Sequence, residues 1–144
     1  MKVSTKGRYA LRLMINLAAD KSGKPVSIKD VSKSEEISDK YLEQIISILN
    51  SGGLVRSIRG PQGGYLLRKK PEDITVGMVL RLTEGTLSPV ACVEEDAIEC
   101  DREYKCATID FWRRLDKAIS DVVDNTTIAD LVANRPAAGD DYSI

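Results

Sequence analysis

The sequence has no histidine, and it holds only three cysteines, one phenylalanine and one tryptophan among 144 residues. The lack of histidine removes the side chain that most often serves as a general base or binds a metal ion. No apolar run approaches the 18 residues of a membrane span, and charges occupy the N-terminus in place of an apolar signal segment. We therefore expect a single cytoplasmic protein without a membrane partner.

Motifs of catalysis are also missing from the chain. It has no C-x-x-C pair, no phosphate-binding loop and no paired nucleophile and base. The odd number of cysteines argues against a disulfide framework. These absences predict that the protein is not an enzyme.

The formal net charge of −1 conceals two halves of opposite sign. Residues 1–70 hold 14 Lys and Arg against 6 Asp and Glu, a net of +8, whereas residues 71–144 hold 7 against 16, a net of −9. Such asymmetry favours a basic half that meets a polyanion. The alternative is chance segregation of charge within one solvated domain.

The basic half predicts three helices and a hairpin. Residues 8–20 carry one apolar stripe at helical spacing, Ser27 can cap a short second helix, and residues 38–50 form a third. Two β-prone runs, 54–59 and 65–68, flank a glycine-rich turn. Two short helices followed by a hairpin predict a winged helix-turn-helix. The expected buried positions of the first and third helices are Ala10, Leu13, Met14, Leu17 and Ala18, and Leu42, Ile45, Ile46 and Leu49.

The acidic half predicts a helix from Thr75, an irregular segment over 86–102, a long helix over 103–124 and a short helix from Thr127. The long helix has more apolar surface than a single copy needs, so we expect it to pair across a two-fold axis. The alternative is that its stripe packs only on its own domain. This stripe comprises Ile109, Trp112, Leu115, Ile119, Val122 and Val123.

The third helix and the hairpin tip carry candidate DNA contacts. Gln44 can present its amide to adenine, and Glu43 can accept a hydrogen bond from cytosine. Arg59 at the tip can enter the minor groove or read guanine, and Gly60 lets the backbone approach phosphates. The alternatives are a solvated polar face or a winged helix that docks a protein.

All three cysteines fall within one 15-residue stretch, as Cys92, Cys100 and Cys106. Their C-x7-C-x5-C spacing does not fit the paired C-x2-C knuckles of structural zinc sites. Three neighbouring thiolates suit an iron–sulfur cluster or zinc, and a redox-sensing trio of thiols is a third option. Spacing alone leaves these three open.

Three segments, residues 3–10, 41–44 and 59–65, closely resemble the small dimeric bacterial regulators that include IscR, NsrR and CymR, and the likeness covers residues 1–132. The resemblance implies a mainly α fold with a small β-hairpin wing, and a long C-terminal dimerisation helix. It also implies double-stranded DNA with a palindromic operator as partner. The base contacts that it implies are Glu43, Gln44 and Arg59, with Ser38, Lys40 and Tyr41 close by. Together with Gly60 at the hairpin tip, these are the candidate DNA-binding residues.

The same resemblance implies a 2Fe–2S cluster on the three cysteines, with 4Fe–4S or zinc as the other occupants. The positions matching the family's known fourth ligands hold Ile109 and Arg8, which do not ligate. An oxygen donor is therefore expected, and Asp110 beside the vacant position is the candidate. Asp101 and Glu103 flank the same loop, and a second subunit or solvent would also serve.

The resulting hypothesis is a dimeric repressor that senses cluster status, controls genes of iron–sulfur cluster biogenesis and receives its cluster from assembly proteins. The predicted parts are a DNA-binding domain over 1–83, a sensor loop over 84–102, a dimerisation region over 103–132 and a disordered tail over 133–144. The alternatives are a nitric oxide or redox sensor of the NsrR type and a CymR-like regulator of cysteine metabolism controlled by a protein partner.

Overall fold

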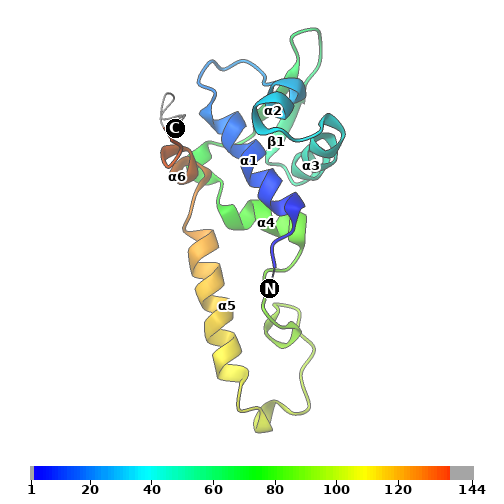
Figure 1. The fold of residues 1–144 in the computed structure, drawn as a ribbon. Helices are drawn as coiled ribbons and strands as arrows, with labels where there is room; N and C mark the ends of the chain where they lie inside the picture. The colour runs from blue at the N-terminus through cyan, green and yellow to red at the C-terminus, as the bar shows by residue number, and fades with distance from the viewer. Residues whose placement is uncertain (1, 137–144) are drawn as a thin grey trace, which may run out of the picture.

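The computed structural model describes residues 2–136, and it is mainly helical with one two-stranded hairpin, as predicted (Figure 1). Of the tail predicted from residue 133, residues 137–144 lie outside the described part. The helices are α1 (Thr5–Ala19), α2 (Ile28–Glu35), α3 (Asp39–Ser51), α4 (Val76–Glu84), α5 (Ile109–Asp124) and α6 (Ile128–Ala133). The strands are β1 (Val55–Ile58) and β2 (Gly64–Leu67), and the single 3-10 turns are η1 (Pro71–Asp73), η2 (Ala91–Val93) and η3 (Glu103–Lys105).

The core forms around α1, which packs against α3, α4 and α6. All five positions of the predicted α1 stripe are buried, and so are all four of the α3 stripe. Both helices have the 3.6-residue apolar period that turns one face inward, so sequence periodicity alone identified their faces. This core holds the polar face of α3 on the outside of the molecule.

The turn between α2 and α3 is built from local capping interactions. The Ser27 and Ser38 hydroxyls accept hydrogen bonds from backbone N–H groups in the first turns of α2 and α3. Glu36 ends α2 in the left-handed region at φ 57°, and its N–H donates to the Ser32 carbonyl. The short turn fixes the angle at which α3 leaves α2.

The hairpin pairs β1 with β2 antiparallel, with Val55 opposite Leu67 and Ile58 opposite Gly64. Its tip bends at Gly60, whose φ of +116° is rarely open to residues with a Cβ. The hairpin is fastened to the segment before α2 through its second strand, because Val26 and Tyr65 exchange backbone hydrogen bonds of 3.0 and 2.9 Å. The wing is thus anchored to the helix-turn-helix.

The chain leaves this body through α4 and returns to it at α6. The Thr75 and Thr127 hydroxyls cap the two helices. Backbone bonds of 2.8 Å join Val76 N to the Thr126 carbonyl and Ile128 N to the Ile74 carbonyl. Ile128 is fully buried, and α6 packs against α1.

The prediction of a helix beginning at residue 103 is wrong, because α5 begins six residues later, at Ile109. Residues 103–105 form only the 3-10 turn η3, and Cys106 then takes an extended backbone that interrupts the helix. Cysteine and threonine are weak helix formers, which fits a break at this point of the sequence. The break places Cys106 in the loop rather than on a helix face.

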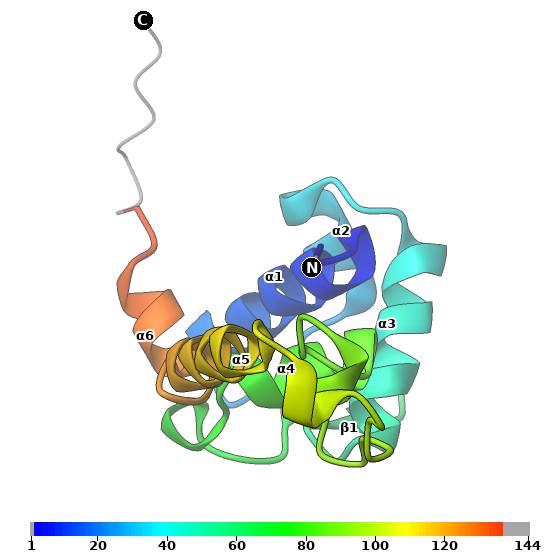
Figure 2. The same ribbon diagram turned by 90° about the horizontal axis from the view of Figure 1, so that it is seen from below.

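We call the part formed by α1–α4, α6 and the hairpin the winged body. Helix α5 extends away from it, and the loop after α4 runs beside α5 to its far end (Figure 1). Viewed roughly along its axis, α5 lies beside α4 and away from α2 and α3 (Figure 2). Among the described residues, no helix combines the length and the apolar character needed to cross a membrane.

Candidate nucleic-acid interface and cysteine pocket

Four polar side chains form the outer face of α3, on the side opposite its buried stripe. Lys40, Glu43, Gln44 and Ser47 are all exposed. A recognition helix needs this division, with one face docked on its own domain and the other free for base edges. The candidates Glu43 and Gln44 are therefore available to DNA, and their contacts with bases remain predictions.

Two of the proposed DNA contacts also have local structural roles. The Ser38 hydroxyl accepts a hydrogen bond from the Tyr41 N–H as the cap of α3. The half-buried Tyr41 ring packs edge-on against Tyr9, with 5.8 Å between ring centroids. Both residues thus orient α3 whether or not they touch DNA.

Arg59 and Gly60 are exposed at the tip of the hairpin. The tip is tight: the Gly63 N–H donates to the Gly60 carbonyl, and a Cβ at Gly63 would lie 2.2 Å from the Ile58 carbonyl oxygen. The hairpin loop and α3 lie toward the same end of the molecule, away from the cysteine loop (Figure 1). Arg59 and the polar face of α3 can therefore meet one duplex together.

Helix α5 has two apolar faces. The apolar stripe predicted from the sequence lies mainly on the inner one. Ile109, Trp112, Ile119 and Val123 are half-buried. Phe111 and Val122 are instead 53% and 66% exposed. With Leu115 and Ala118 they form an outward strip at spacings of 4, 3 and 4 residues, which is the spacing of a coiled-coil seam. We call Phe111, Leu115, Ala118 and Val122 the α5 strip.

The sequence stripe included Leu115 and Val122 but missed Phe111 and Ala118. The signal for them was present, since residues 111, 115, 118 and 122 repeat with heptad spacing. An apolar residue on a helix does not by itself tell whether it packs on its own domain or on another copy.

The three cysteines line a single pocket of about 390 Å³, formed by the loop before α5 and the first turns of that helix. We call it the cysteine pocket. Its other lining residues are Ala97, Ile98, Glu99, Glu103, Ile109 and Arg113. All three cysteines are free thiols and exposed. The spacing argument for a common site is thus matched by a common cavity.

The thiols surround this cavity without converging on one point. Within residues 2–136, no three Cys, Asp or Glu side chains come together closely enough to hold a single metal ion. A single zinc ion requires ligands at 2.0–2.3 Å. The donors present are soft thiols with nearby carboxylates, which suit thiophilic metals in their chemistry.

The thiol of Cys106 is stabilised as a thiolate by its surroundings. The Thr108 hydroxyl lies 3.4 Å from the Cys106 sulfur. The hydrogen bonds from the Thr108 side chain and backbone lower the pKa of the Cys106 thiol below its ordinary value, because they stabilise the thiolate. The thiolate is the form that ligates metals and reacts with electrophiles.

This hydrogen bond predicts the pH dependence of alkylation. In the metal-free protein, Cys106 should reach half-maximal reaction with iodoacetamide at a lower pH than the about 8.5 of a free cysteine. Thr108→Ala should raise that midpoint. Mass spectrometry of the Cys106 peptide across a pH series measures it, and Thr86→Ala is the control. An unchanged midpoint in Thr108→Ala would contradict the role of the hydroxyl.

Two of the acidic candidates for a fourth ligand, Glu103 and Asp110, differ in whether they line the cysteine pocket. Glu103 lines the cysteine pocket, and its carboxylate accepts a hydrogen bond from Arg113. The Asp110 side chain is 90% exposed and lies 3.5 Å from the other side of the same guanidinium, outside the pocket lining. Of the two, only Glu103 shares the cavity with the thiols.

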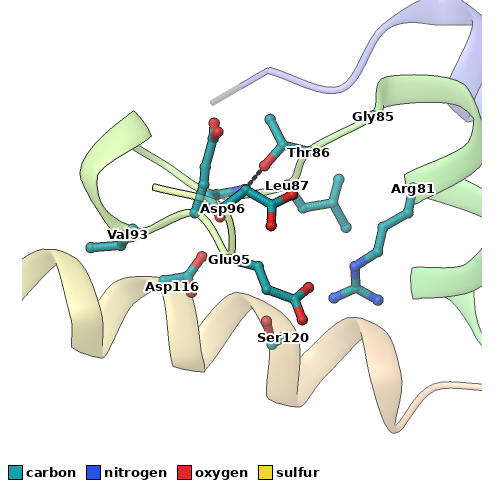
Figure 3. A pocket seen from close by; sticks show the side chains of 11 residues that line it. Arg81, Gly85, Thr86, Leu87, Val93, Glu95, Asp96, Asp116 and Ser120 are labelled. Carbon is teal, nitrogen blue, oxygen red and sulfur yellow. Dashed lines mark hydrogen bonds between the residues drawn. The ribbon is translucent and has the colours of Figure 1, made fainter. Parts of the chain in front are cut away.

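A second, polar pocket of about 420 Å³ lies between α4, the loop after it and α5. Arg81 and Glu95 extend toward each other across it (Figure 3). Arg81 also forms a two-pronged ion pair with Asp124, at 2.5 and 3.1 Å. That hydrogen-bonded pair raises the pKa of the Arg81 guanidinium, which stays charged. The pair fastens the middle of α4 to the end of α5.

Known proteins match this chain over most of its length. Residues 3–134 match the family model of Rrf2, described as iron-dependent transcriptional regulators. The transcriptional regulator CymR of Bacillus subtilis is 41% identical over 133 residues, covering 92% of this chain and 91% of CymR. The regulator IscR of Pectobacterium atrosepticum is 38% identical over 135 residues, covering 94% and 81%.

Solved structures agree with these sequences. The structure of CymR, the global cysteine regulator of B. subtilis, has a TM-score of 0.77 at 42% identity and covers 94% of this chain and 99% of CymR. The T. potens IscR structure has a TM-score of 0.74 at 36% identity and covers 96% and 94%. The winged helix-turn-helix predicted from the sequence is thereby confirmed.

Proposed function

This chain belongs to the Rrf2 family of transcriptional regulators, and from that premise we propose that it is a dimeric repressor which senses an iron–sulfur cluster through the cysteine pocket. It is a DNA-binding regulator and not an enzyme. The observation that carries the sensing proposal is that all three cysteines line one cavity next to the start of α5.

The proposed DNA interface consists of two winged helix-turn-helix domains, one from each copy of the chain, which we call the reading heads. Each head uses the exposed face of α3 in the major groove and Arg59 of the hairpin at an adjacent groove. One head covers too few base pairs to select a promoter in a genome. Two copies joined through the α5 strip would read a palindrome, because the two-fold axis of the dimer matches that of the site.

The proposed occupant of the cysteine pocket is a cluster rather than a lone ion. No three Cys, Asp or Glu side chains among residues 2–136 lie close enough to hold one metal ion, which favours a larger group that bridges the thiols of the pocket. A 2Fe–2S cluster spans a wider gap, and Cys92, Cys100 and Cys106 would hold it. When bound, it would supply a group sensitive to oxygen, nitric oxide and iron supply.

In this proposal, α4 couples the cysteine pocket to the DNA-binding surface. The Glu84 carboxylate at its end accepts hydrogen bonds from the Ser4 hydroxyl and N–H at 2.6 and 3.2 Å, which joins α4 to the start of α1. The Arg81–Asp124 pair joins it to α5. Ordering of the cysteine loop would therefore bias the angle between α5 and the winged body, and with it the spacing of the two reading heads.

The decisive experiment compares DNA binding with and without the cluster at one stated salt concentration. Anaerobically reconstituted protein and its chelated form should differ in operator affinity by about 5- to 150-fold. A variant with all three cysteines changed to serine should bind DNA and show no such difference. Absorption and Mössbauer spectra identify the cluster type. A colourless, zinc-loaded wild-type protein would contradict cluster sensing.

A second candidate is favoured by the 41% identity to CymR. In this alternative a partner protein in cysteine metabolism supplies the signal, and the thiols have no part in it. The triple serine variant separates the two proposals, since partner-controlled DNA binding would survive in it. Nitric oxide sensing would appear instead as loss of DNA binding on nitrosylation of the reconstituted wild type.

A further inference from the structure

We propose that Glu103 supplies the fourth ligand of the cluster, held in place by Arg113. The inference rests on the proposed function, since it assigns the one ligand which the cysteines leave open. It differs from the expectation that the sequence supported, which placed this ligand at Asp110.

The backbone brings Glu103 into line with two of the cysteines. The Glu103 N–H donates to the Cys100 carbonyl at 3.1 Å, and the Cys106 N–H donates to the Glu103 carbonyl at 3.0 Å. Each is the i to i+3 bond of a tight turn, and in the 3-10 geometry that residues 103–105 adopt, side chains three positions apart lie on the same side. Cys100, Glu103 and Cys106 are therefore successive positions on one edge of the loop, and all three line the cavity.

The position that follows Cys106 by three residues does not continue this series with a donor. It holds Ile109, which lines the pocket as an apolar wall. The next acidic residue, Asp110, extends into solvent with 90% of its side chain exposed. Two carboxylates therefore share the cavity with the thiols, those of Glu99 and Glu103, and Glu103 is the one that Arg113 holds in place.

Arg113 gives Glu103 the support that a metal ligand needs. Its guanidinium lines the pocket and donates to the Glu103 carboxylate, which fixes the orientation of that group. A carboxylate has about four acceptor sites on two oxygens, so it can keep this hydrogen bond and still bind iron. Arg113 also offsets one of the negative charges that three thiolates and a carboxylate bring together, as outer-shell partners commonly do.

The test uses an isosteric pair of variants, Glu103→Gln and Asp110→Asn. Each removes one carboxylate charge next to Arg113, and only the first removes a group that lines the pocket. After anaerobic reconstitution with ferrous iron and sulfide, Glu103→Gln should lose iron to a chelator at least about tenfold faster than wild type. Its Mössbauer spectrum should change at one iron site. Asp110→Asn should match wild type in both measurements.

Far-UV circular dichroism and DNA binding of the metal-free variants verify that each variant is folded, and Glu103→Asp should restore part of the iron retention. If wild type binds a cluster and Glu103→Gln shows the same chelation rate and spectrum, the assignment of Glu103 is overturned while the proposed function stands. If Asp110→Asn is the variant that changes, Asp110 is the ligand. If wild type takes up no iron and sulfide, the proposed function fails, and the inference fails with it.

Discussion

Two glutamates placed on the α5 strip, by Ala118→Glu with Val122→Glu, are expected to convert the proposed dimer to monomers and to weaken binding to a palindromic operator by roughly 10³-fold. Val122 is 66% exposed and Ala118 is exposed in the single chain. Charges there cost the isolated fold little, because they stay in water. In the dimer they would be buried opposite their own copies, where like charges repel without compensation.

The matched control is Lys117→Glu, which changes the net charge by the same two units on the polar side of α5. Lys117 is paired with Asp121 at 2.6 Å across an exposed helix face, so its loss should cost about 0.5 kcal/mol of stability or less. Sedimentation measures the oligomeric state, and fluorescence anisotropy measures operator affinity. A double variant that stays dimeric would show that the α5 strip is not the dimer interface.

The second large effect is expected from Gln44→Ala combined with Arg59→Ala. Each base contact is worth about 1–3 kcal/mol, so the pair should weaken operator binding by about 2–6 kcal/mol, or roughly 30- to 10⁴-fold, if the two act independently. Both side chains are exposed and outside the core, so the fold should be unaffected. Binding to scrambled duplex should change far less.

The control for this pair is Arg68→Ala, a basic residue at the end of β2 that is exposed and removed from the hairpin tip. A phosphate contact weakens binding to every sequence equally and reduces the salt dependence, whereas a base contact carries sequence preference. The operator itself can be selected from random duplex DNA with wild-type protein. If the double variant keeps the wild-type ratio of operator affinity to scrambled-duplex affinity, Gln44 and Arg59 do not contribute to sequence recognition.

The fold of the winged body could be predicted because the sequence features that indicate its helices and its hairpin are local. Apolar period fixed the buried faces of α1 and α3, and Ser27, Ser38, Thr75 and Thr127 marked helix starts that the structure places within one residue. The glycine-rich tip likewise identified the hairpin. Each of these features depends on residues within one turn or a few positions of one another.

The loop between α4 and α5 was less predictable because few apolar contacts define it. Residues 94–108 lack the periodicity that locates an element, so the break at Cys106 and the late start of α5 did not show in the sequence. The place of Glu103 in the cavity depends on turns stabilised by single backbone bonds. The division of α5 into inner and outer apolar faces depends on tertiary packing, which periodicity does not contain.

Backbone hydrogen bonds tie Val76 to Thr126 and Ile74 to Ile128, and they give the molecule a modular architecture. They close residues 85–124, from the end of α4 to the end of α5, into a segment that leaves the winged body and rejoins it. A segment closed in this way can open and re-form locally while the body beneath it stays folded. A different segment placed between the same two paired ends would be joined to the same DNA-binding body. Under the proposed function, the cysteine pocket and the DNA-binding surface thus lie on separate parts of the chain, and the backbone pairing of residues 74–76 with 126–128 is one of the links between them.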